Sequence, residues 1–252
     1  MTTIWLGGII RLSNERGNEK TMDKRINYKI VIDTETCPLD TEFEGVDPMN
    51  MFVYDVGWVV TDKKGNVYVA RSFVVDEIFN KENDLMKSSY YAHKLPRYRE
   101  EIVQGTRTVA NFYTIRKTLL DDMKEYGISE VYAHNMRFDY HTLNNTERWL
   151  TKSKYRFFFP YGTEICDTLR MARDVIGKMP TYKSFCETNN YLTKTGRLSM
   201  KAEHLYRFIS KDNDFIESHT SLEDVLIEKE IMAYCYRQKK SMERHLWAKK
   251  VA

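Results

Sequence analysis

Cysteine is scarce in this chain of 252 residues, and the four that occur are scattered. None belongs to a C-x-x-C pair or has a histidine at the spacing of a zinc ligand. The sequence therefore predicts neither a disulfide framework nor a structural zinc site. A reducing cytosol is the simplest compartment for such a chain.

Long apolar runs are missing as well. The apolar stretch at residues 4–10 has no basic residue before it and no small-residue cleavage signature after it. It is also far too short to cross a bilayer. We therefore expect no export signal and no membrane partner.

Charge of one sign is not in large excess, because 39 Lys and Arg stand against 36 Asp and Glu. A net charge of +3 is too small to require a polyanionic partner. Aromatic residues are plentiful, with 17 Tyr, 12 Phe and 4 Trp, and their rings are surfaces on which single-stranded nucleic acid stacks. The composition permits nucleic acid as a partner without demanding it.

The first 27 residues differ from those that follow. They consist of the short apolar stretch and then a polar run, which predicts an N-terminal extension that is flexible. A second interpretation stays open, in which Met22 is the natural start and the residues before it are a translated leader. Residues 28–252 have the composition of one α/β domain.

The spacing of apolar residues predicts the strands of a mixed sheet and the helices that accompany it. The pattern predicts strands at 28–36, 52–62, 65–75 and 130–135, helices at 109–127 and 138–150, a strand running into a helix within 155–177, two helices flanking a turn within 183–209, and a long amphipathic helix at 221–247. We expect the strand at 130–135 to pair parallel to the first one, since it follows a helix.

Two carboxylates at the end of the first predicted strand need an explanation. Asp33 and Glu35 are two positions apart, so their side chains point the same way on a strand. Two such charges repel by roughly 4 kcal/mol at about 4 Å when the effective dielectric constant is about 20. Mg²⁺ or Mn²⁺ between them would remove this repulsion. The alternative is that both simply lie in a solvated loop after the strand.

Two later stretches contain further acids. Asp139 follows a strand that ends in His134 and Asn135 and lies at the start of a helix. Near the C-terminus, Ser221 and Asp224 form an S-x-x-D pattern, which predicts a capping box that places Asp224 in the first turn of a helix. His219 precedes this helix in a loop. Taken alone, this second stretch is explained by capping and an ordinary loop histidine.

Together the D-x-E, H-N-x-x-F-D and H-x-x-x-x-D patterns, in this order over roughly residues 28–240, resemble the three motifs of the DEDDh branch of the DnaQ-like 3′-to-5′ exonucleases. Among these, the chain looks most similar to stand-alone exonucleases of bacteriophages and bacteria. The resemblance implies an RNase H-like α/β fold, with a mixed five-stranded sheet and helices on both faces. It also implies the cytoplasm of a bacterial or phage-infected cell.

The chain departs from the family pattern in three places. Cys37 and Pro38 stand where the family often has Thr-Gly, the loop at residues 40–51 is longer than usual, and residues 177–213 resemble an insertion before the third motif. These departures put the details of substrate contact in doubt.

The resemblance also implies the chemistry of the site, with two divalent metal ions, Mg²⁺ or Mn²⁺, as cofactors. Asp33 would bridge both ions, Glu35 and Asp224 would hold the ion that carries the attacking water, and Asp139 would support the second ion. His219 would take the proton of that water.

Substrate contacts are less clearly indicated. The family's contacts with the terminal nucleotide correspond to backbone amides around Thr34 and Thr36, and Asn135 would reach the nucleic-acid backbone. Further candidates, each of which could equally be core, loop or solvated surface, are a wedge at Met49, Met51 and Phe52 and an aromatic and basic cluster at Tyr90, Tyr91, His93, Lys94, Arg97 and Arg99.

The expected activity is 3′-to-5′ hydrolysis of single-stranded DNA to nucleoside 5′-monophosphates. An exoribonuclease or oligonucleotide-degrading enzyme is an alternative, because recognition of the 2′-hydroxyl is not visible in a sequence. A further alternative is a proofreading or accessory subunit that binds a polymerase or another replication protein. Residues 177–213 and the basic tail at 237–250 would then be its docking surfaces.

Overall fold

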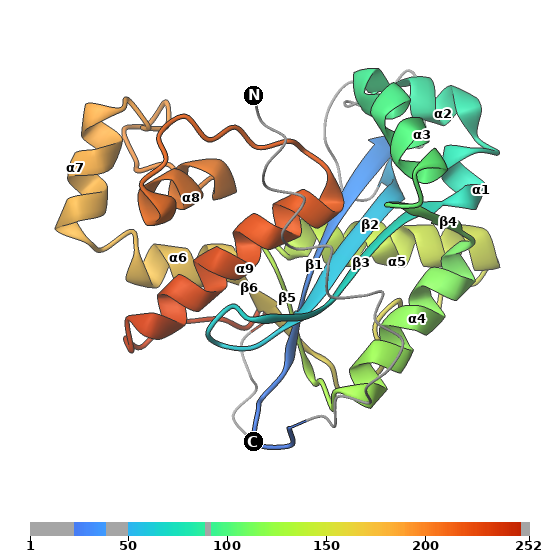
Figure 1. Cartoon of the computed structure of the whole chain (residues 1–252), viewed down its shortest axis with the longest axis horizontal. Coiled ribbons are helices and arrows are strands. Elements are labelled where there is room, and N and C mark those ends of the chain that lie inside the picture. Colours follow the sequence, from blue (N-terminus) through green and yellow to red (C-terminus); the bar gives the residue numbers. More distant parts are fainter. Residues whose placement is uncertain (1–22, 39–49, 89–91, 248–252) are drawn as a thin grey trace.

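The computed structural model describes residues 23–38, 50–88 and 92–247. Its centre is one six-stranded sheet with the strand order β4-β3-β2-β1-β5-β6 (Figure 1). The strands are β1 (Lys29–Pro38), β2 (Met51–Thr61), β3 (Val67–Val75), β4 (Thr108–Ala110), β5 (Glu130–Ala133) and β6 (Glu164–Asp167).

The sheet is mixed, as the sequence predicts. Strands β1, β2 and β3 form an antiparallel meander, and β5 pairs parallel to β1 and to β6. The prediction of five strands missed β4, a three-residue edge strand parallel to β3. Its residues were assigned to the start of a helix, which instead begins at Phe112, because the side chain of Asn111 accepts a hydrogen bond from the Thr114 amide and caps it there.

Helices cover both faces of the sheet, and the two faces have separate hydrophobic clusters. Ile30 and Ile32 of β1 pack with α4 (Phe112–Glu125) and α5 (Arg137–Thr151), whereas Val31 belongs to the opposite cluster. The period of two along a strand produces this division. The helices on the Val31 face are α6 (Thr168–Val175), α7 (Pro180–Thr188), α8 (Ala202–Ser210) and α9 (Ser221–Arg237).

Short helices fill the connection from β3 to β4 and lie to the right in Figure 1, at the end of the sheet where β1 finishes. The buried ring of Tyr98 joins them to the core around β2. These helices are α1 (Asp76–Phe79), α2 (Asn83–Ser88), η3 (Ala92–Lys94) and α3 (Leu95–Val103).

The predicted pair of helices within residues 183–209 is confirmed. Helices α7 and α8 flank a small hairpin with a bridge between Leu192 and Leu198, and Gly196 at its turn has a φ of +74°. Such a φ favours glycine. The two helices extend to the left of α9 in Figure 1 and form a lobe of their own.

The last predicted helix is too long. Helix α9 ends at Arg237, and the chain then runs beside β6, where the Asp167 amide donates to the Arg244 carbonyl oxygen at 2.7 Å. The polar residues after Arg237 supply no apolar face that could continue the helix. Pairing with β6 instead satisfies backbone groups at a sheet edge.

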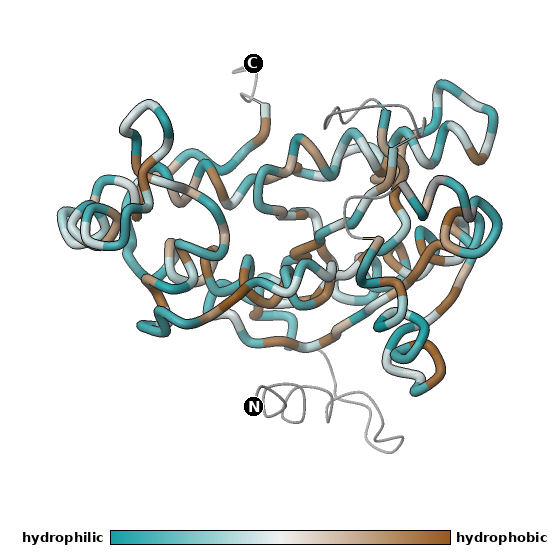
Figure 2. The backbone as a smooth tube through the Cα atoms, turned by 90° about the horizontal axis from the view of Figure 1, so that it is seen from above, coloured by the Kyte–Doolittle hydropathy of each residue, from teal (hydrophilic) through white to brown (hydrophobic). Residues whose placement is uncertain are grey.

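Hydrophobic segments lie mainly in the interior, and hydrophilic ones lie on the outer turns of the helices (Figure 2). None of the helices in the described ranges combines the length and the apolar character needed to cross a membrane. The N-terminal extension falls almost entirely outside the described residues, as do Met49, Tyr90, Tyr91 and the end of the basic tail.

Candidate active site

The first and third motifs meet at the end of β1. Asp33 and Glu35 lie on the same side of this strand as Val31 and therefore face α9, as their spacing predicts. Asp224, in the first turn of α9, brings a third carboxylate, and one oxygen from each of the three lies within 4.8 Å of the others.

A glycine opposite Asp33 makes this approach possible. Gly57 of β2 pairs with Asp33, and a Cβ atom at Gly57 would lie 2.5 Å from the backbone nitrogen of Leu222. Any larger residue would therefore push the start of α9 away from the sheet. The sequence signal was present, since a glycine inside a strand often marks a close backbone approach, but sequence reasoning did not use it.

The start of α9 is anchored by a residue that sequence analysis missed. The predicted cap at Ser221 is wrong, because Thr220 is the N-cap and Ser221 is already helical. The Ser221 amide donates to the carboxylate of the buried Asp55 on β2 at 3.1 Å. Asp55 is itself paired with Arg107 and accepts a hydrogen bond from the Tyr98 hydroxyl. A carboxylate distant in sequence thus replaces the local cap.

Asp139 approaches the site from the other side of β1. Its carboxylate accepts a hydrogen bond of 2.8 Å from the Thr34 hydroxyl, and Thr34 points away from Asp33 on the strand. It does not belong to the group of three within 4.8 Å. Burial raises the pKa of Asp139 to about 7, although the Thr34 bond acts in the opposite direction.

Sequence analysis also missed Glu228, which lies one turn after Asp224 on α9 and is 3% exposed. Its carboxylate accepts a hydrogen bond of 3.0 Å from the His134 amide and so joins the second motif to the third. Its charge raises the pKa of Asp33. The four-residue spacing on an inward-facing helix stripe was the signal that could have identified it.

The electrostatics of this cluster favour a bound cation. Burial, and then repulsion between neighbouring carboxylates, raise the pKa values of Asp33, Glu35 and Asp224 well above the usual range. The buried Oδ1 atom of Asp224 has no hydrogen-bond partner among the described residues. Clustered carboxylate oxygens are the ligands that Mg²⁺ and Mn²⁺ prefer, so these residues fit a divalent metal site.

His219 lies beside the carboxylates in the loop before α9. Its ring and the carboxylates of Glu217 and Asp224 form a second group within 4.8 Å, and its Nδ1 atom is 3.8 Å from Glu217. The backbone of His219 has a φ of +53°, a conformation that is uncommon for residues other than glycine. Burial lowers the pKa of His219, so its imidazole is neutral and able to accept a proton near pH 7.

The predicted substrate contacts lie around this cluster. Thr34 and Thr36 are buried in β1, and Asn135 is exposed with a φ of +66°. The backbone amide of Asn135 donates to the carboxylate of Asp167, which holds this turn at the end of β5. His134 has a structural position, because its ring nitrogens contact Thr168 and the carbonyl oxygen of residue 200.

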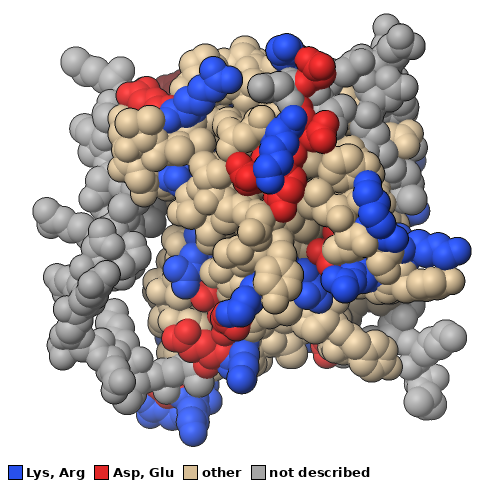
Figure 3. Space-filling model, turned by 90° about the vertical axis from the view of Figure 1, so that its right-hand side faces the viewer, with Lys and Arg blue, Asp and Glu red and all other residues tan. Residues whose placement is uncertain are grey.

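The other candidates divide into separate environments. Phe52 is buried against Trp149, with 4.6 Å between the ring centroids, so it is core and not a wedge, and Met51 is buried beside it. Arg97 is paired with Glu101 and Glu223. On the side that carries α1 to α4, Lys and Arg are interspersed with Asp and Glu (Figure 3). The predicted basic cluster is therefore not a continuous cationic track.

Lys94, by contrast, interacts electrostatically with the site. Its charge interacts favourably with Glu35 and Asp224, while burial lowers its pKa. It also contributes to the lowered pKa of His219. A cation in this position, at the edge of the carboxylates, is suited to contact a phosphate.

No family model and no curated protein matches the sequence. Solved structures do match the fold. A full-length 3′-exonuclease aligns with a TM-score of 0.54 at 13% identity, over 93% of this chain and 71% of that one. Exonuclease I from Methylocaldum szegediense gives 0.53 at 15% identity, over 84% and 41%. Cell-death related nuclease 4 gives 0.52 at 11% identity, over 87% and 67%.

This chain therefore shares the fold of these solved nucleases, a mixed sheet with helices on both faces, as its motifs predict; the described residues form six strands in place of five. It spans about two fifths of the Exonuclease I chain from Methylocaldum szegediense, so the match concerns only one part of that protein.

Proposed function

We propose that this protein is a metal-dependent 3′-to-5′ exonuclease that hydrolyses single-stranded DNA to nucleoside 5′-monophosphates by a two-metal-ion mechanism. One observation carries the proposal: the carboxylates of Asp33, Glu35 and Asp224 converge within 4.8 Å, although Asp224 lies far from the other two in the sequence. The fold shared with solved 3′-exonucleases supports the same function.

The carboxylates are the metal-holding part of this proposal. Asp33, Glu35 and Asp224 would bind one ion, and Asp33 with Asp139 would bind the second, partly through water. Two such ions, when bound, supply an activated water, neutralise charge on the phosphate and stabilise the leaving 3′ oxygen. Zinc is bound in a solved E. coli Exonuclease I complex with single-stranded DNA, which has the same fold at 15% identity and a TM-score of 0.51.

His219 is the proton acceptor in the proposed reaction. Its ring is partly exposed, neutral at pH 7 and adjacent to Asp224, so it can take the proton of a water held there. The carboxylate of Glu217 lies 3.8 Å from the Nδ1 atom of the same ring. Transfer of the proton leaves a positively charged ring between two carboxylates, which stabilises that charge.

Single-stranded DNA is the proposed substrate. A base-paired end would first have to unstack, at a cost of a few kcal/mol per base. E. coli Exonuclease I, which shares the fold at a TM-score of 0.52, was solved in complex with a dT13 oligonucleotide. In this proposal, Asn135 and Lys94 would contact the sugar-phosphate backbone of the terminal nucleotide.

A 5′-labelled oligonucleotide tests polarity and product together. We expect a ladder that shortens with time in Mg²⁺ or Mn²⁺, no cleavage in chelator, and nucleoside 5′-monophosphates as products. Asp121→Asn is a matched control, because this exposed carboxylate on α4 pairs with Lys117 away from the site. Cleavage of a circular strand, or immediate release of the labelled 5′ nucleotide, would contradict the proposal.

A matched RNA oligonucleotide decides between the two enzymatic alternatives. We expect DNA to be cleaved faster, and the reverse ratio would make the protein an exoribonuclease. Binding to a polymerase or another replication protein stays a prediction from the sequence alone.

A further inference from the structure

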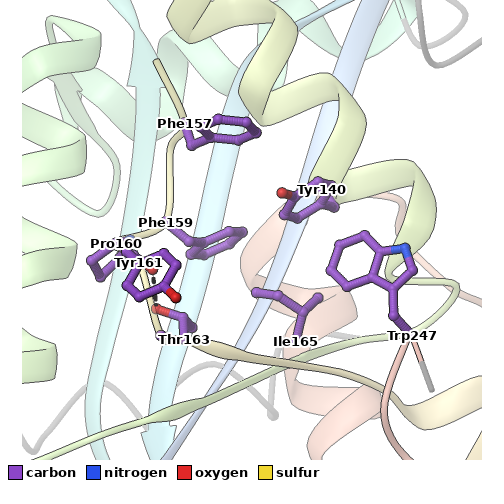
Figure 4. Close-up of a pocket in the computed structure, with 9 residues that line it drawn as sticks. Tyr140, Phe157, Phe159, Pro160, Tyr161, Thr163, Ile165 and Trp247 are labelled. Atoms are coloured by element: carbon purple, nitrogen blue, oxygen red, sulfur yellow. Dashed lines mark hydrogen bonds between the residues drawn. The ribbon is translucent and has the colours of Figure 1, made fainter. Parts of the chain in front are cut away.

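A shallow aromatic pocket lies on the α5 face of the sheet, apart from the carboxylate cluster. Its volume is about 260 Å³, and it is lined by α5, β6, the loop between them and the C-terminal segment beside β6. Figure 4 shows the rings of Tyr140, Phe159 and Trp247 around one hollow, with Phe157 and Tyr161 at its margin. We call these five residues, together with Tyr155 of the same loop, the aromatic patch.

The aromatic patch is unusually exposed. Eight large apolar side chains are exposed within the described ranges, and four of them belong to the patch. Tyr161 is fully exposed, Tyr155 is 80% exposed, and Trp247 and Phe157 are about half exposed. Contiguous exposed apolar surface of this kind marks a binding site more often than isolated apolar residues do.

Positive charge accompanies these rings. Residues 148–163 contain no acidic residue but four basic ones, namely Arg148, Lys152, Lys154 and Arg156. The Arg148 guanidinium lies 4.9 Å from the centroid of the Phe157 ring, and the Lys154 ammonium lies 5.4 Å from that of Tyr155. Arg156 lies 3.9 Å from the carboxylate of Glu147, directly before this range. Flat rings interleaved with cations are complementary to a polymer of bases and phosphates. An apolar peptide would match the rings but not the charges of Arg148 and Lys154.

The size of the pocket also favours a single flat ring, such as one nucleobase, as the group that binds in it. Its volume is below the roughly 300–1,000 Å³ of sites for complete small molecules. The existing rings already pack edge to face, with 4.8 Å between the centroids of Tyr140 and Trp247. Their open side accepts another flat group in the same way.

The patch is connected to the proposed active site by helix α5. Asp139 and Tyr140 are neighbours in the first turn of α5, while the basic residues of 148–163 begin in its last turn. A helix of 15 residues is about 22 Å long. A strand whose 3′ end lies at the carboxylates can therefore reach the patch within a few nucleotides.

We infer that the aromatic patch is a second binding site for single-stranded DNA, which holds the substrate on the 5′ side of the nucleotide being removed. This inference rests on the proposed function for its substrate. The patch binds by stacking and phosphate contacts, neither of which depends on sequence. It therefore strengthens the binding of long strands and leaves very short ones unaffected.

The test measures the binding of labelled DNA to the full chain in chelator, where no cleavage occurs. One strand has about 2 nucleotides and the other about 30, so that only the longer one covers both sites. We expect the double variant Tyr161→Ala, Trp247→Ala to bind the long strand about 5- to 100-fold more weakly, and the short strand as the wild type does. Tyr113→Ala is the control, because Tyr113 is an exposed aromatic residue on α4 outside the patch.

Charge is tested separately. Lys154→Gln should reduce the slope of log affinity against log salt concentration by about 0.7 for the long strand, the loss expected for one phosphate contact. Because binding is measured without catalysis, this result stands even where nuclease activity is absent. If the protein cleaves DNA but the wild type and the double variant bind the long strand equally well, the second site is overturned while the proposed exonuclease function stands. Dissociation of a dimer in the double variant, with DNA affinity unchanged, would assign the patch to a protein contact and also overturn it.

Discussion

Both ends of strand β1 bury charged side chains, but at one end the neighbouring charges have the opposite sign and at the other they have the same sign. At its start, the fully buried ammonium of Lys29 pairs with Glu130, and Glu130 also forms an ion pair with Arg244 at 3.0 Å. At its end, Asp33 and Glu35 face a further acid, Asp224. The first cluster contains its own counter-charges. The second is a group of like charges.

Burial shifts the pKa values at both ends. It lowers the pKa of Lys29 to about 8, and it raises those of Asp33 and Glu35. At the first end the ion pair with Glu130 offsets part of the cost of burial within the fold. At the second end the neighbouring charges increase the cost, which protonation or a bound cation would remove. Buried charge with a partner therefore indicates structure, whereas buried charge without one indicates function.

The end of β1 that carries Asp33 and Glu35, where buried acids have like charges as neighbours, is called the unmatched end; the start of β1, where Lys29 pairs with Glu130, is called the matched end. Replacing a residue at the unmatched end should separate activity from stability most clearly. We expect Asp33→Asn to reduce nuclease activity to background, because both proposed metal ions depend on this carboxylate. In chelator at pH 8, the free energy of unfolding should rise, because the variant no longer carries a buried charge among other acids. The rise should be about 1.4 kcal/mol for each unit by which folding raises the pKa of Asp33. Denaturation in urea measures this. A large loss of stability would show instead that Asp33 is structural.

The imidazole at the same end should affect turnover alone. We expect His219→Ala to lower kcat by about 10² to 10⁴, the usual contribution of a general base, with little change in KM or in the melting temperature. The pH profile of the remaining activity should lose the inflection that belongs to His219. Unchanged turnover between pH 6 and 9 would remove His219 from the mechanism.

The matched end should show the opposite behaviour. Lys29→Met leaves Glu130 with only Arg244, and breaking a buried pair typically costs about 3–5 kcal/mol. We expect that loss in urea unfolding, while the protein that remains folded keeps its kcat. A fall in kcat without a fall in stability would mean that the two ends of β1 are not independent.

Gly57 tests how closely α9 must approach the unmatched end. Gly57→Ala places a methyl group against Leu222 and should destabilise the fold by about 1–3 kcal/mol through overpacking. Because the displaced helix carries Asp224, the apparent affinity for Mg²⁺ should fall as well. Gly105→Ala is a useful comparison, since a Cβ atom there meets nothing within 4 Å, although its positive φ adds some strain. An unchanged requirement for Mg²⁺ in Gly57→Ala would contradict this account.

The smallest expected effect is the pH dependence of the metal-free protein. Carboxylates whose pKa is raised in the folded state stabilise it below their unfolded value of about 4, and this stability is lost as the pH rises through the folded value, which is about 7 for Asp139. In chelator the melting temperature should therefore fall from pH 5 to pH 8. Saturating Mg²⁺ should reverse the fall, so that it stabilises more at pH 8. Equal stabilisation at both pH values would count against the carboxylates as metal ligands.

Local patterns predicted most of the elements correctly. The strand alternation around Asp33, the parallel strand at 130–135 and the helical pair around Gly196 are all present in the structure. Two of the errors occurred where a distant residue overrides a local signal. Asp55 replaces Ser221 as the cap of α9, and pairing with β6 replaces the predicted end of the last helix.

The amino-acid sequence by itself determined which residues carry the candidate chemistry, because the period of a strand and the first turn of a helix fix where Asp33, Glu35 and Asp224 point. Only the tertiary structure decided how closely they meet. The distance depends on Gly57, which lets α9 touch the sheet, and on Asp55, which holds its first turn. Those contacts join residues more than 150 positions apart, and no pattern of neighbouring residues encodes such a contact.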